Sequence, residues 1–144
     1  MKEGGKCKNS IKPLKYQTYV IWFFCFSPIA TIAAFRHGEE YRQQMLAYIE
    51  ENIRFVEDFC REHIPGIRPL RPQASFLAWL NCRDLHLNHE QLLDLFIDKA
   101  HLALNDGEMF GPGGEGFMRF NVESPRVIIR QALEQLAEAV GKQS

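Results

Sequence analysis

The sequence has few of the patterns that mark metal, disulfide or redox sites. Its four cysteines, Cys7, Cys25, Cys60 and Cys82, lie far apart and form no C-x-x-C pair, so neither a zinc site nor a disulfide framework is indicated. Its histidines include no H-x-x-x-H pair of the kind that binds zinc from one face of a helix. We therefore predict reduced thiols, with Cys60 and Cys82 packed in the core.

An excess of charge of either sign is also missing. The 17 lysines and arginines nearly balance the 18 aspartates and glutamates, and the formal net charge is -1. This balance provides no electrostatic surface for nucleic acid or anionic lipid, so we expect no nucleic-acid partner. Hydrophobic residues make up 46% of the 144 residues, which suffices for one compact domain with a single core.

The one long apolar run lies near the N-terminus. Residues 1–15 carry five lysines, and residues 19–35 carry no charge. This order is typical of a signal peptide or anchor, but the run is at the short end for a membrane span and Pro28 interrupts it. We expect a cytoplasmic protein with no membrane contact, in which residues 1–25 are an atypical basic, then apolar, segment. Secretion, anchoring, and packing of the run against a partner surface stay open as alternatives.

The body of the chain begins with a helical pattern. Between Tyr41 and Phe59, apolar residues recur at spacings of three and four, opposite a charged face. Three prolines and a glycine within residues 64–72 then form a connector that cannot continue a helix. Residues 74–82 are bulky and apolar on both faces, as expected for a central strand covered on each side.

A second helix is predicted from a capping pattern. Asn88 can cap its N-terminus, and Gln91 follows three residues later in a capping-box arrangement. Leu92, Phe96 and Ala100 recur at a spacing of four and form its apolar stripe, which Leu93 and Ile97 reinforce.

The last third of the chain alternates extended and helical patterns. Residues 103–122 contain a short extended piece, a glycine-rich loop and a strand, and Ser124 and Pro125 read as the N-cap and first residue of a helix that ends at Gly141. The order is thus helix, strand, helix, short strand, strand, helix. It predicts an α/β (α+β) two-layer sandwich, with helices packed on a small, mostly antiparallel sheet.

Two familiar kinds of site are not supported. The glycine-rich loop (residues 106–116) contains GPGGEG, but it connects two strands and lacks the Walker lysine, so we interpret it as a turn or as a mouth loop that approaches a ligand. Ser27 and Ser75 have no histidine and aspartate partners that the sequence singles out, so a hydrolase triad is not indicated.

Arg119 is the candidate binding residue. It lies among Phe117, Met118 and Phe120 in a strand that reads as buried, although its guanidinium cannot lose its charge. Burying it unpaired costs several kcal/mol, so it needs either a carboxylate within the protein or an anionic ligand. Glu115 or Glu123 could be the internal partner, and a planar carboxylate is the ligand that a guanidinium grips best. The spacing leaves both alternatives open.

Three segments together resemble the C-terminal small domain of cystathionine β-lyase-like C-S lyases of the PatB/MalY type: CFSPIATIAAFRHGEEYRQQMLAYIEENIRFV, RPQASFLAWLNCRDLHLNHEQLLDLFIDKAHLALNDGEMFG and GEGFMRFNVESPRVIIRQALEQL. These enzymes depend on pyridoxal 5'-phosphate (PLP) and belong to fold type I of the class I/II aminotransferase superfamily. The resemblance covers residues 26–140, so we treat residues 26–144 as one aminotransferase-like domain. It implies that Arg119 binds the α-carboxylate of the amino-acid substrate. It also implies that Phe76 lies on a strand and residues 107–111 near the active-site mouth.

The sequence departs from this family in one large respect. The resembling enzymes are several times longer, and the lysine that bonds PLP lies in a large domain upstream of the matched part. Lys12 only faintly echoes that lysine, and we name no catalytic residue. We therefore expect a small-domain fragment that contributes Arg119, is inactive alone and binds no PLP by itself. Its partners would be the amino-acid substrate of the complete enzyme and a second copy. A stand-alone carboxylate-binding or interaction module, and a class I aminotransferase in place of a lyase, are the alternatives.

Overall fold

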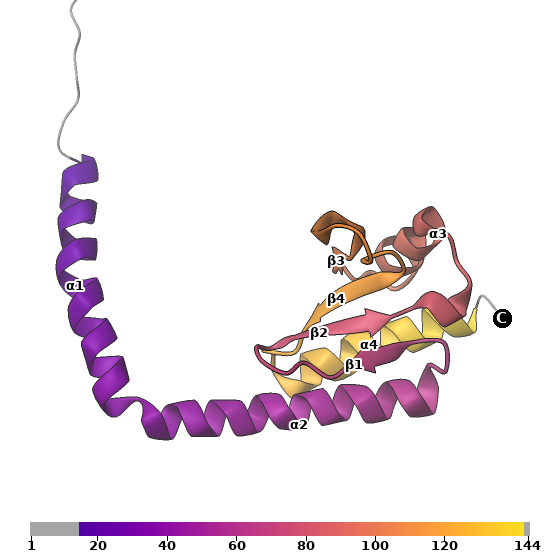
Figure 1. The fold of residues 1–144 in the computed structure, drawn as a ribbon, viewed down its shortest axis with the longest axis horizontal. Helices are drawn as coiled ribbons and strands as arrows, with labels where there is room; N and C mark the ends of the chain where they lie inside the picture. The colour runs from indigo at the N-terminus through magenta and orange to yellow at the C-terminus, as the bar shows by residue number, and fades with distance from the viewer. Residues whose placement is uncertain (1–14, 143–144) are drawn as a thin grey trace, which may run out of the picture. The chain divides into compact units, whose positions relative to one another are not determined.

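The chain forms two compact units, which are described separately. The structure is a computed structural model that describes residues 15–142, with side chains from residue 26 onward (Figure 1). The first unit ends at Gln43, and the second begins at Gln44. The division after Gln43 separates two groups of residues that pack mainly among themselves. The domain boundary predicted after residue 25 marks a change in composition and the start of the family resemblance, which is a different property. That boundary stays a prediction.

The described part of the first unit, residues 15–43, is mainly helical. Helix α1 spans Lys15–His37 and continues through Pro28. The expectation that Pro28 interrupts this segment is therefore wrong for the helix. Gly38 separates α1 from α2 (Glu39–His63), and a Cβ at Gly38 would lie 2.5 Å from the carbonyl oxygen of Ala34, which leaves no room for a side chain. Within residues 15–142, no helix combines the length and hydropathy needed to cross a membrane.

The second unit contains a four-stranded antiparallel sheet. Its strands are β1 (Arg68–Leu70), β2 (Leu77–Asn81), β3 (Asn105–Asp106) and β4 (Phe117–Asn121), in the spatial order β1-β2-β4-β3. The central position predicted for residues 74–82 is confirmed, because β2 pairs with both β1 and β4. The expectation that this strand is covered on each side is wrong, because its residues alternate between buried and half-buried. Strand β1 lies in the proline-rich connector and was not predicted. It is an edge strand, the place in a sheet where proline is tolerated.

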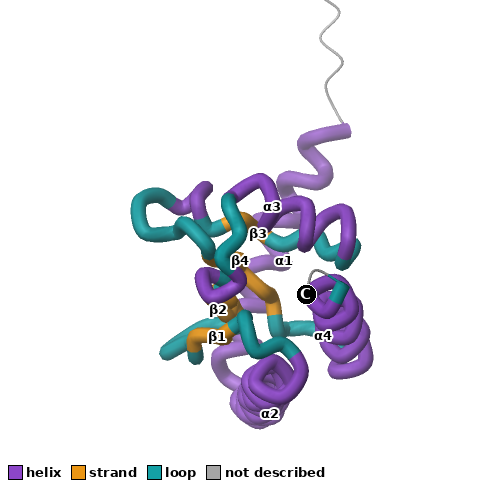
Figure 2. The backbone as a smooth tube through the Cα atoms, turned by 90° about the vertical axis from the view of Figure 1, so that its right-hand side faces the viewer, coloured by secondary structure: helices purple, strands orange, loops and turns teal. Residues whose placement is uncertain are grey.

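Helices cover one face of the sheet. The core joins buried residues of α2 and of α4 (Arg126–Gly141) to those of the central strands, and Leu80 and Met118 are both 0% exposed. Figure 2 shows α2 and α4 beside the strands, with α3 (His89–Asp94) above them. A π-helical turn, η2 (Leu95–Lys99), continues α3. The predicted two-layer α/β sandwich is confirmed.

The stripe and the cap predicted for the second helix are both confirmed. Leu92, Phe96 and Ala100 are buried in the core and Leu93 is half-buried, whereas Ile97 is 50% exposed and does not reinforce the stripe. The Asn88 side chain accepts the backbone N–H of Gln91 at 2.9 Å, and the Gln91 side chain accepts the backbone N–H of Asn88 at 3.0 Å. Each side chain thus satisfies a backbone donor that the first helical turn leaves free.

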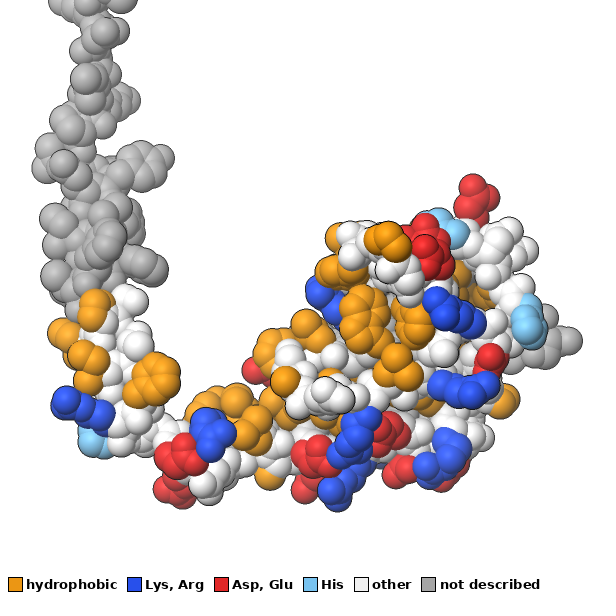
Figure 3. All heavy atoms as spheres, in the orientation of Figure 1, with side chains coloured by type: hydrophobic (Ala, Val, Ile, Leu, Met, Phe, Trp, Pro, Cys, Tyr) orange, Lys and Arg blue, Asp and Glu red, His pale blue; other side chains and the backbone are white. Residues whose placement is uncertain are grey.

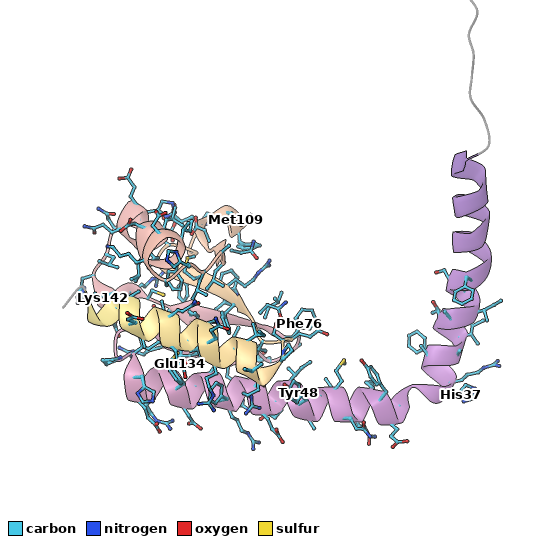
Figure 4. The ribbon with its side chains drawn as sticks, turned by 180° about the vertical axis from the view of Figure 1, so that it is seen from behind. His37, Tyr48, Phe76, Met109, Glu134 and Lys142 are labelled. Atoms are coloured by element: carbon cyan, nitrogen blue, oxygen red, sulfur yellow. The ribbon has the colours of Figure 1, made fainter. Side chains whose placement is uncertain are left out.

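The start of the last helix is displaced by one residue from its prediction. Pro125, not Ser124, is the N-cap, and no side chain of the cap itself accepts a hydrogen bond. Instead the hydroxyl of Tyr48, on α2, accepts the backbone N–H of Arg126 at 2.8 Å. Figure 4 shows Tyr48 beside the end of α4 that lies away from Lys142. A residue 78 positions away along the chain therefore supplies the cap, which no local pattern could indicate.

A buried amide joins α2 to the end of β4. Asn52 is 0% exposed, and its Nδ2 donates to the carbonyl oxygens of Val122 and Ser124 at 2.9 and 3.0 Å. Its Oδ1 accepts the Nε–H of Arg126 at 2.6 Å. Every polar atom of this buried side chain is bonded, as burial of an amide requires.

The two thiols that were predicted to lie in the core do so. Cys60 and Cys82 are free and buried, and burial raises the pKa of each thiol from 9.0 to about 12. Both thiols are therefore protonated and unreactive at neutral pH. Cys7 and Cys25, like Lys12, lie outside the residues whose side chains the structure describes.

Candidate functional site

Arg119 lies in a row of side chains that crosses the uncovered face of the sheet. Leu70 is opposite Trp79, Trp79 is opposite Arg119, and Arg119 is opposite Asn105. Residues directly opposite on neighbouring strands point to the same face, so all four strands contribute one member to this row. Their neighbours Leu80 and Met118 point the other way, into the helix-covered core.

The guanidinium of Arg119 has two close neighbours. One terminal nitrogen donates to Oδ1 of Asn105 at 2.9 Å, and Cζ lies 4.4 Å from the centroid of the Phe110 ring. The residue is half-buried, and its Nε is buried without any hydrogen-bond partner. Buried N–H groups of this kind are rare, because an unmade hydrogen bond of a charged donor costs more than that of a neutral one.

Neither internal carboxylate considered for Arg119 is its partner. The Glu115 carboxylate accepts the backbone N–H of Gly113 at 2.9 Å, and Arg119 forms no ion pair with any residue whose side chain the structure describes. By contrast, Arg126 donates to Asn52 and lies 3.7 Å from the Glu51 carboxylate. Arg119 thus retains donors for an anion, and Arg126 is used within the fold.

A cavity of about 270 Å³ opens beside this row. Its apolar lining is made by Leu70, Trp79, Phe110, Pro112 and Phe117, and glycines of the glycine-rich loop also line it. The Phe110 ring meets the Trp79 ring edge-on, with centroids 5.4 Å apart, so it contacts both the cavity and Arg119. Figure 3 shows hydrophobic side chains gathered over β2 and β4 on the face toward the viewer.

Arg83 holds the glycine-rich loop in place. It follows β2 in the short 3-10 turn η1 (Arg83–Leu85), and its guanidinium donates to the carbonyl oxygens of Glu115 and Gly113 at 2.9 and 3.2 Å. Gly116 has φ +77°, and a Cβ there would lie 2.7 Å from Cγ of Arg83. The side chain of Arg83, 30 or more residues away in the sequence, therefore fixes the shape of this loop. No local pattern in the sequence indicates this contact.

The loop is also closed at its base. The backbones of Gly107 and Gly114 approach so closely that a Cβ at Gly107 would lie 2.2 Å from the Gly114 carbonyl oxygen. Between them, the 3-10 turn η3 (Glu108–Phe110) carries Phe110 toward Arg119. His89 lies 2.9 Å from the Glu108 carboxylate and 3.6 Å from that of Asp106, and so connects α3 to this turn. The mouth-loop interpretation agrees with this cavity-lining position.

Phe76 lies next to the strand that the resemblance implied, not on it. It immediately precedes β2, is half-buried and labelled in Figure 4, and its carbonyl oxygen accepts the backbone N–H of Val122 at 2.9 Å. The pairing of this segment with the end of β4 continues beyond the strand by one hydrogen bond.

The described side chains fit a carboxylate ligand better than PLP. A Schiff-base lysine would have to lie near Arg119, but no described lysine lines the cavity, and Lys99 and Lys142 form ion pairs with Asp94 and Glu138. Among the side chains of residues 26–142, no other lysine occurs. The site therefore supplies a cation, an amide and aromatic rings, which can bind and orient an anion but cannot form a bond to a carbonyl cofactor.

Two curated proteins that are similar to this chain share the name cystathionine beta-lyase. No protein-family model matches the chain. A putative cystathionine beta-lyase of Mycobacterium leprae is 34% identical over 78% of this chain and 31% of its own length. Cystathionine beta-lyase PatB of Bacillus subtilis is 30% identical over 80% of this chain and 30% of its own length. The chain thus spans about a third of the length of these curated relatives.

Solved structures agree with this similarity. A PLP-bound putative aminotransferase from Clostridium difficile 630 superimposes with a TM-score of 0.77 at 32% identity, over 87% of this chain and 34% of the other. Cystalysin from Treponema denticola, which contains PLP, gives a TM-score of 0.73 at 28% identity, over 77% of this chain and 28% of the other.

Proposed function

Since this chain belongs to the family of PLP-dependent cystathionine β-lyase-like C-S lyases, as a counterpart of their C-terminal small domain, we propose that Arg119 binds the α-carboxylate of an amino acid. In this role Arg119 fixes one end of the substrate and so orients its Cα for chemistry carried out elsewhere in the complete site. The chain contributes substrate binding and no catalytic residue.

The observation that carries this proposal is the unused hydrogen-bonding capacity of Arg119. Its Nε is buried without a partner, and only one terminal nitrogen bonds to a side chain, Asn105. A guanidinium can donate two parallel hydrogen bonds to one carboxylate, through Nε and a terminal nitrogen or through both terminal nitrogens. A bound carboxylate would therefore accept hydrogen bonds from Arg119 that no group in the described part of the fold accepts.

The chain alone is proposed to be inactive. The chemistry of the family requires PLP on a lysine in a water-shielded pocket, and no lysine of residues 26–142 lines the cavity beside Arg119. We propose a C-S lyase in preference to an aminotransferase, because the curated relatives from Mycobacterium leprae (34% identical) and Bacillus subtilis (30% identical) are both named cystathionine beta-lyase. Aminotransferases also occur among the similar proteins, so product analysis of the complete enzyme decides this point.

Binding is tested on the full chain with Trp22 replaced by Phe, which leaves Trp79 as the only tryptophan. L-alanine is titrated while tryptophan fluorescence is followed, and L-alaninamide, which lacks the carboxylate, is the matched ligand. We expect Arg119→Gln to weaken L-alanine binding by about tenfold or more, because a charged hydrogen-bonded pair is lost. Arg61→Gln is the control, since Arg61 is an exposed arginine paired with Asp58 on α2. Equal binding of alaninamide, or no effect of Arg119→Gln, would refute the proposal.

Inactivity is tested separately by adding PLP and cystathionine to the purified chain. We expect no pyruvate release and no lysine-dependent change in the PLP absorption spectrum. Turnover that requires a lysine of this chain would overturn the inactivity proposal without touching the role of Arg119.

A stand-alone carboxylate-binding module is the second candidate, and the same free guanidinium favours it. Carboxylate binding by the isolated chain that a PLP-binding partner leaves unchanged supports the module, whereas binding that becomes tighter after addition of such a partner supports the small-domain role. We further propose a cytoplasmic protein that self-associates as a homodimer, which cell fractionation and light scattering test.

A further inference from the structure

A histidine on α3 lies against the chain segment that contacts Arg119. Nδ1 of His89 is 2.9 Å from the Glu108 carboxylate, and Nε2 is 3.6 Å from the carboxylate of Asp106. Both ring nitrogens therefore face oxygens that, when ionised, only accept hydrogen bonds. A neutral imidazole has one N–H and can donate to one of them, whereas the imidazolium has an N–H for each. The two protonation states of His89 thus hold this segment unequally.

These two carboxylates are the charged partners of His89. Among the described residues, no other acidic group lies within ion-pair distance of the ring. The remaining charged residues of α3 and of η2, which continues it, are Glu90, Asp94, Asp98 and Lys99. Lys99 pairs with Asp94 at 2.7 Å. Loss of the proton from His89 therefore leaves Asp106 and Glu108 without a cationic partner among the described side chains.

Residues 105–110 contact Arg119 at both ends. Oδ1 of Asn105 accepts a hydrogen bond from a terminal nitrogen of Arg119 at 2.9 Å, and the Phe110 ring lies 4.4 Å from Cζ of Arg119. Between these ends, the carboxylate of Asp106 also accepts the backbone N–H of the first residue of η3 at 3.2 Å, which ties β3 to η3. The histidine thus holds the middle of a segment whose two ends orient the guanidinium.

We propose that His89 is a positioning residue for Arg119. When protonated, it holds residues 105–110, so that Asn105 and Phe110 keep the guanidinium in one orientation. Deprotonation removes one of the two contacts, and the guanidinium must then be ordered when a carboxylate binds, which weakens binding. Binding is therefore controlled by pH over the range in which histidines commonly titrate, about pH 5 to 8. The inference rests on the proposed function of Arg119 and adds its regulation.

The experiment measures binding of L-alanine to the full chain by calorimetry, from about pH 5.5 to about pH 7.5. L-alanine keeps one charged carboxylate and one charged amino group throughout this range, so its own charge is constant. We expect the wild-type chain to bind about two- to fivefold more tightly at the lower pH, an effect of the size that a partly exposed ion pair supplies. His89→Gln should bind at the weaker level at every pH. His63→Gln, at an exposed position on α2, is the control and should keep the wild-type dependence.

Two carboxylates of the glycine-rich loop provide a matched pair of variants. Glu108→Gln removes a carboxylate that faces His89 and should reduce the pH dependence. Glu115→Gln removes a charge from the same loop, but the Glu115 carboxylate bonds to the backbone of Gly113, so the pH dependence should stay as in the wild-type chain.

Phe110→Ala separates positioning from charge. This variant keeps His89 and both of its carboxylates but removes the ring over Arg119. We expect the pH dependence to shrink, although every charge is unchanged. An undiminished dependence would mean that the charge of the imidazole acts on the ligand directly, and it would overturn the positioning role.

Failure of this inference differs from failure of the proposed function. Equal affinity for L-alanine across the pH range, while Arg119→Gln still weakens binding, would overturn the role of His89 and leave that of Arg119 intact. A wild-type pH dependence in His89→Gln would assign the dependence to another group, with the same consequence. Undiminished binding in Arg119→Gln would instead overturn the proposed function, and the positioning role with it.

Discussion

The two faces of the sheet in the second unit are built from alternating residues of the same strands and yet have opposite chemistry. On the helix-covered face, Leu80 and Met118 are completely buried among apolar side chains. On the other face, Trp79 and Arg119 are half-buried beneath a glycine-rich loop, and a buried nitrogen is left without a partner. The side chains of the helix-covered face pack within the fold, whereas Arg119 on the other face keeps hydrogen-bond donors that a ligand can use. This difference predicts which substitutions affect stability and which affect binding.

The largest effect is expected from shortening a leucine on the helix-covered face. Leu80→Ala should lower the free energy of unfolding by about 2–5 kcal/mol, because it leaves a cavity in a closed core. The matched variant Leu70→Ala, at a 47% exposed position on the other face, should cost about 1 kcal/mol or less. Chemical denaturation of both variants measures the difference. Equal costs would mean that the two faces are packed alike.

The next effect compares two asparagines. Asn52→Ala should cost about 2 kcal/mol, because it leaves the carbonyl oxygens of Val122 and Ser124 and the Nε–H of Arg126 without their hydrogen-bond partner. Asn105→Ala removes the exposed hydrogen bond to Arg119 and a weak one to Sδ of Met109, and it should change stability by about 0.5 kcal/mol. Thermal unfolding followed by circular dichroism tests the ranking. A larger loss for Asn105→Ala would contradict the assignment of a structural role to Asn52.

A smaller effect is expected for the two arginines. Arg126→Met should lower stability by about 1–2 kcal/mol, since it breaks the bond to buried Asn52. Arg119→Met should change stability by about 1 kcal/mol at most, because it removes a buried nitrogen that has no partner as well as one hydrogen bond. Denaturant midpoints of both variants, read with carboxylate binding, separate a structural arginine from a ligand-binding one. A strongly destabilised Arg119→Met would make Arg119 structural as well.

The smallest effect at neutral pH concerns the buried thiols. Burial raises the pKa of Cys60 and Cys82 from 9.0 to about 12, so the folded state keeps two protons that the unfolded state releases above pH 9. Stability should therefore be unaffected below pH 9 and should fall as the pH rises from 9 toward 12. Denaturation between pH 7 and 11 measures this slope.

The thiol prediction has an internal control. The variant Cys7→Ser/Cys25→Ser retains only the two buried thiols, which should react with iodoacetamide at pH 8 only on unfolding. Rapid labelling of the folded protein would show that Cys60 or Cys82 is accessible and that this core is open.

Much of the second unit could be predicted because the relevant signals are local. The stripe of Leu92, Phe96 and Ala100 repeats with the period of a helix, and Asn88 and Gln91 cap each other across three residues. The edge strand β1 was missed because its residues carry prolines, which oppose a strand except at an edge, and edges are defined only by the assembled sheet. The first residue of α4 was misplaced because its donor is bonded by distant Tyr48.

The sequence by itself determined that Arg119 would be a charge held within an apolar strand, because the alternation of residues along a strand and the permanent charge of a guanidinium are both local properties. Only the tertiary structure decided which groups surround it. Asn105, Phe110 and Trp79 reach Arg119 from separate strands and a loop, and Glu115 bonds elsewhere. The pairing of a side chain across a sheet depends on strand order and register, which bring together residues that the chain keeps far apart.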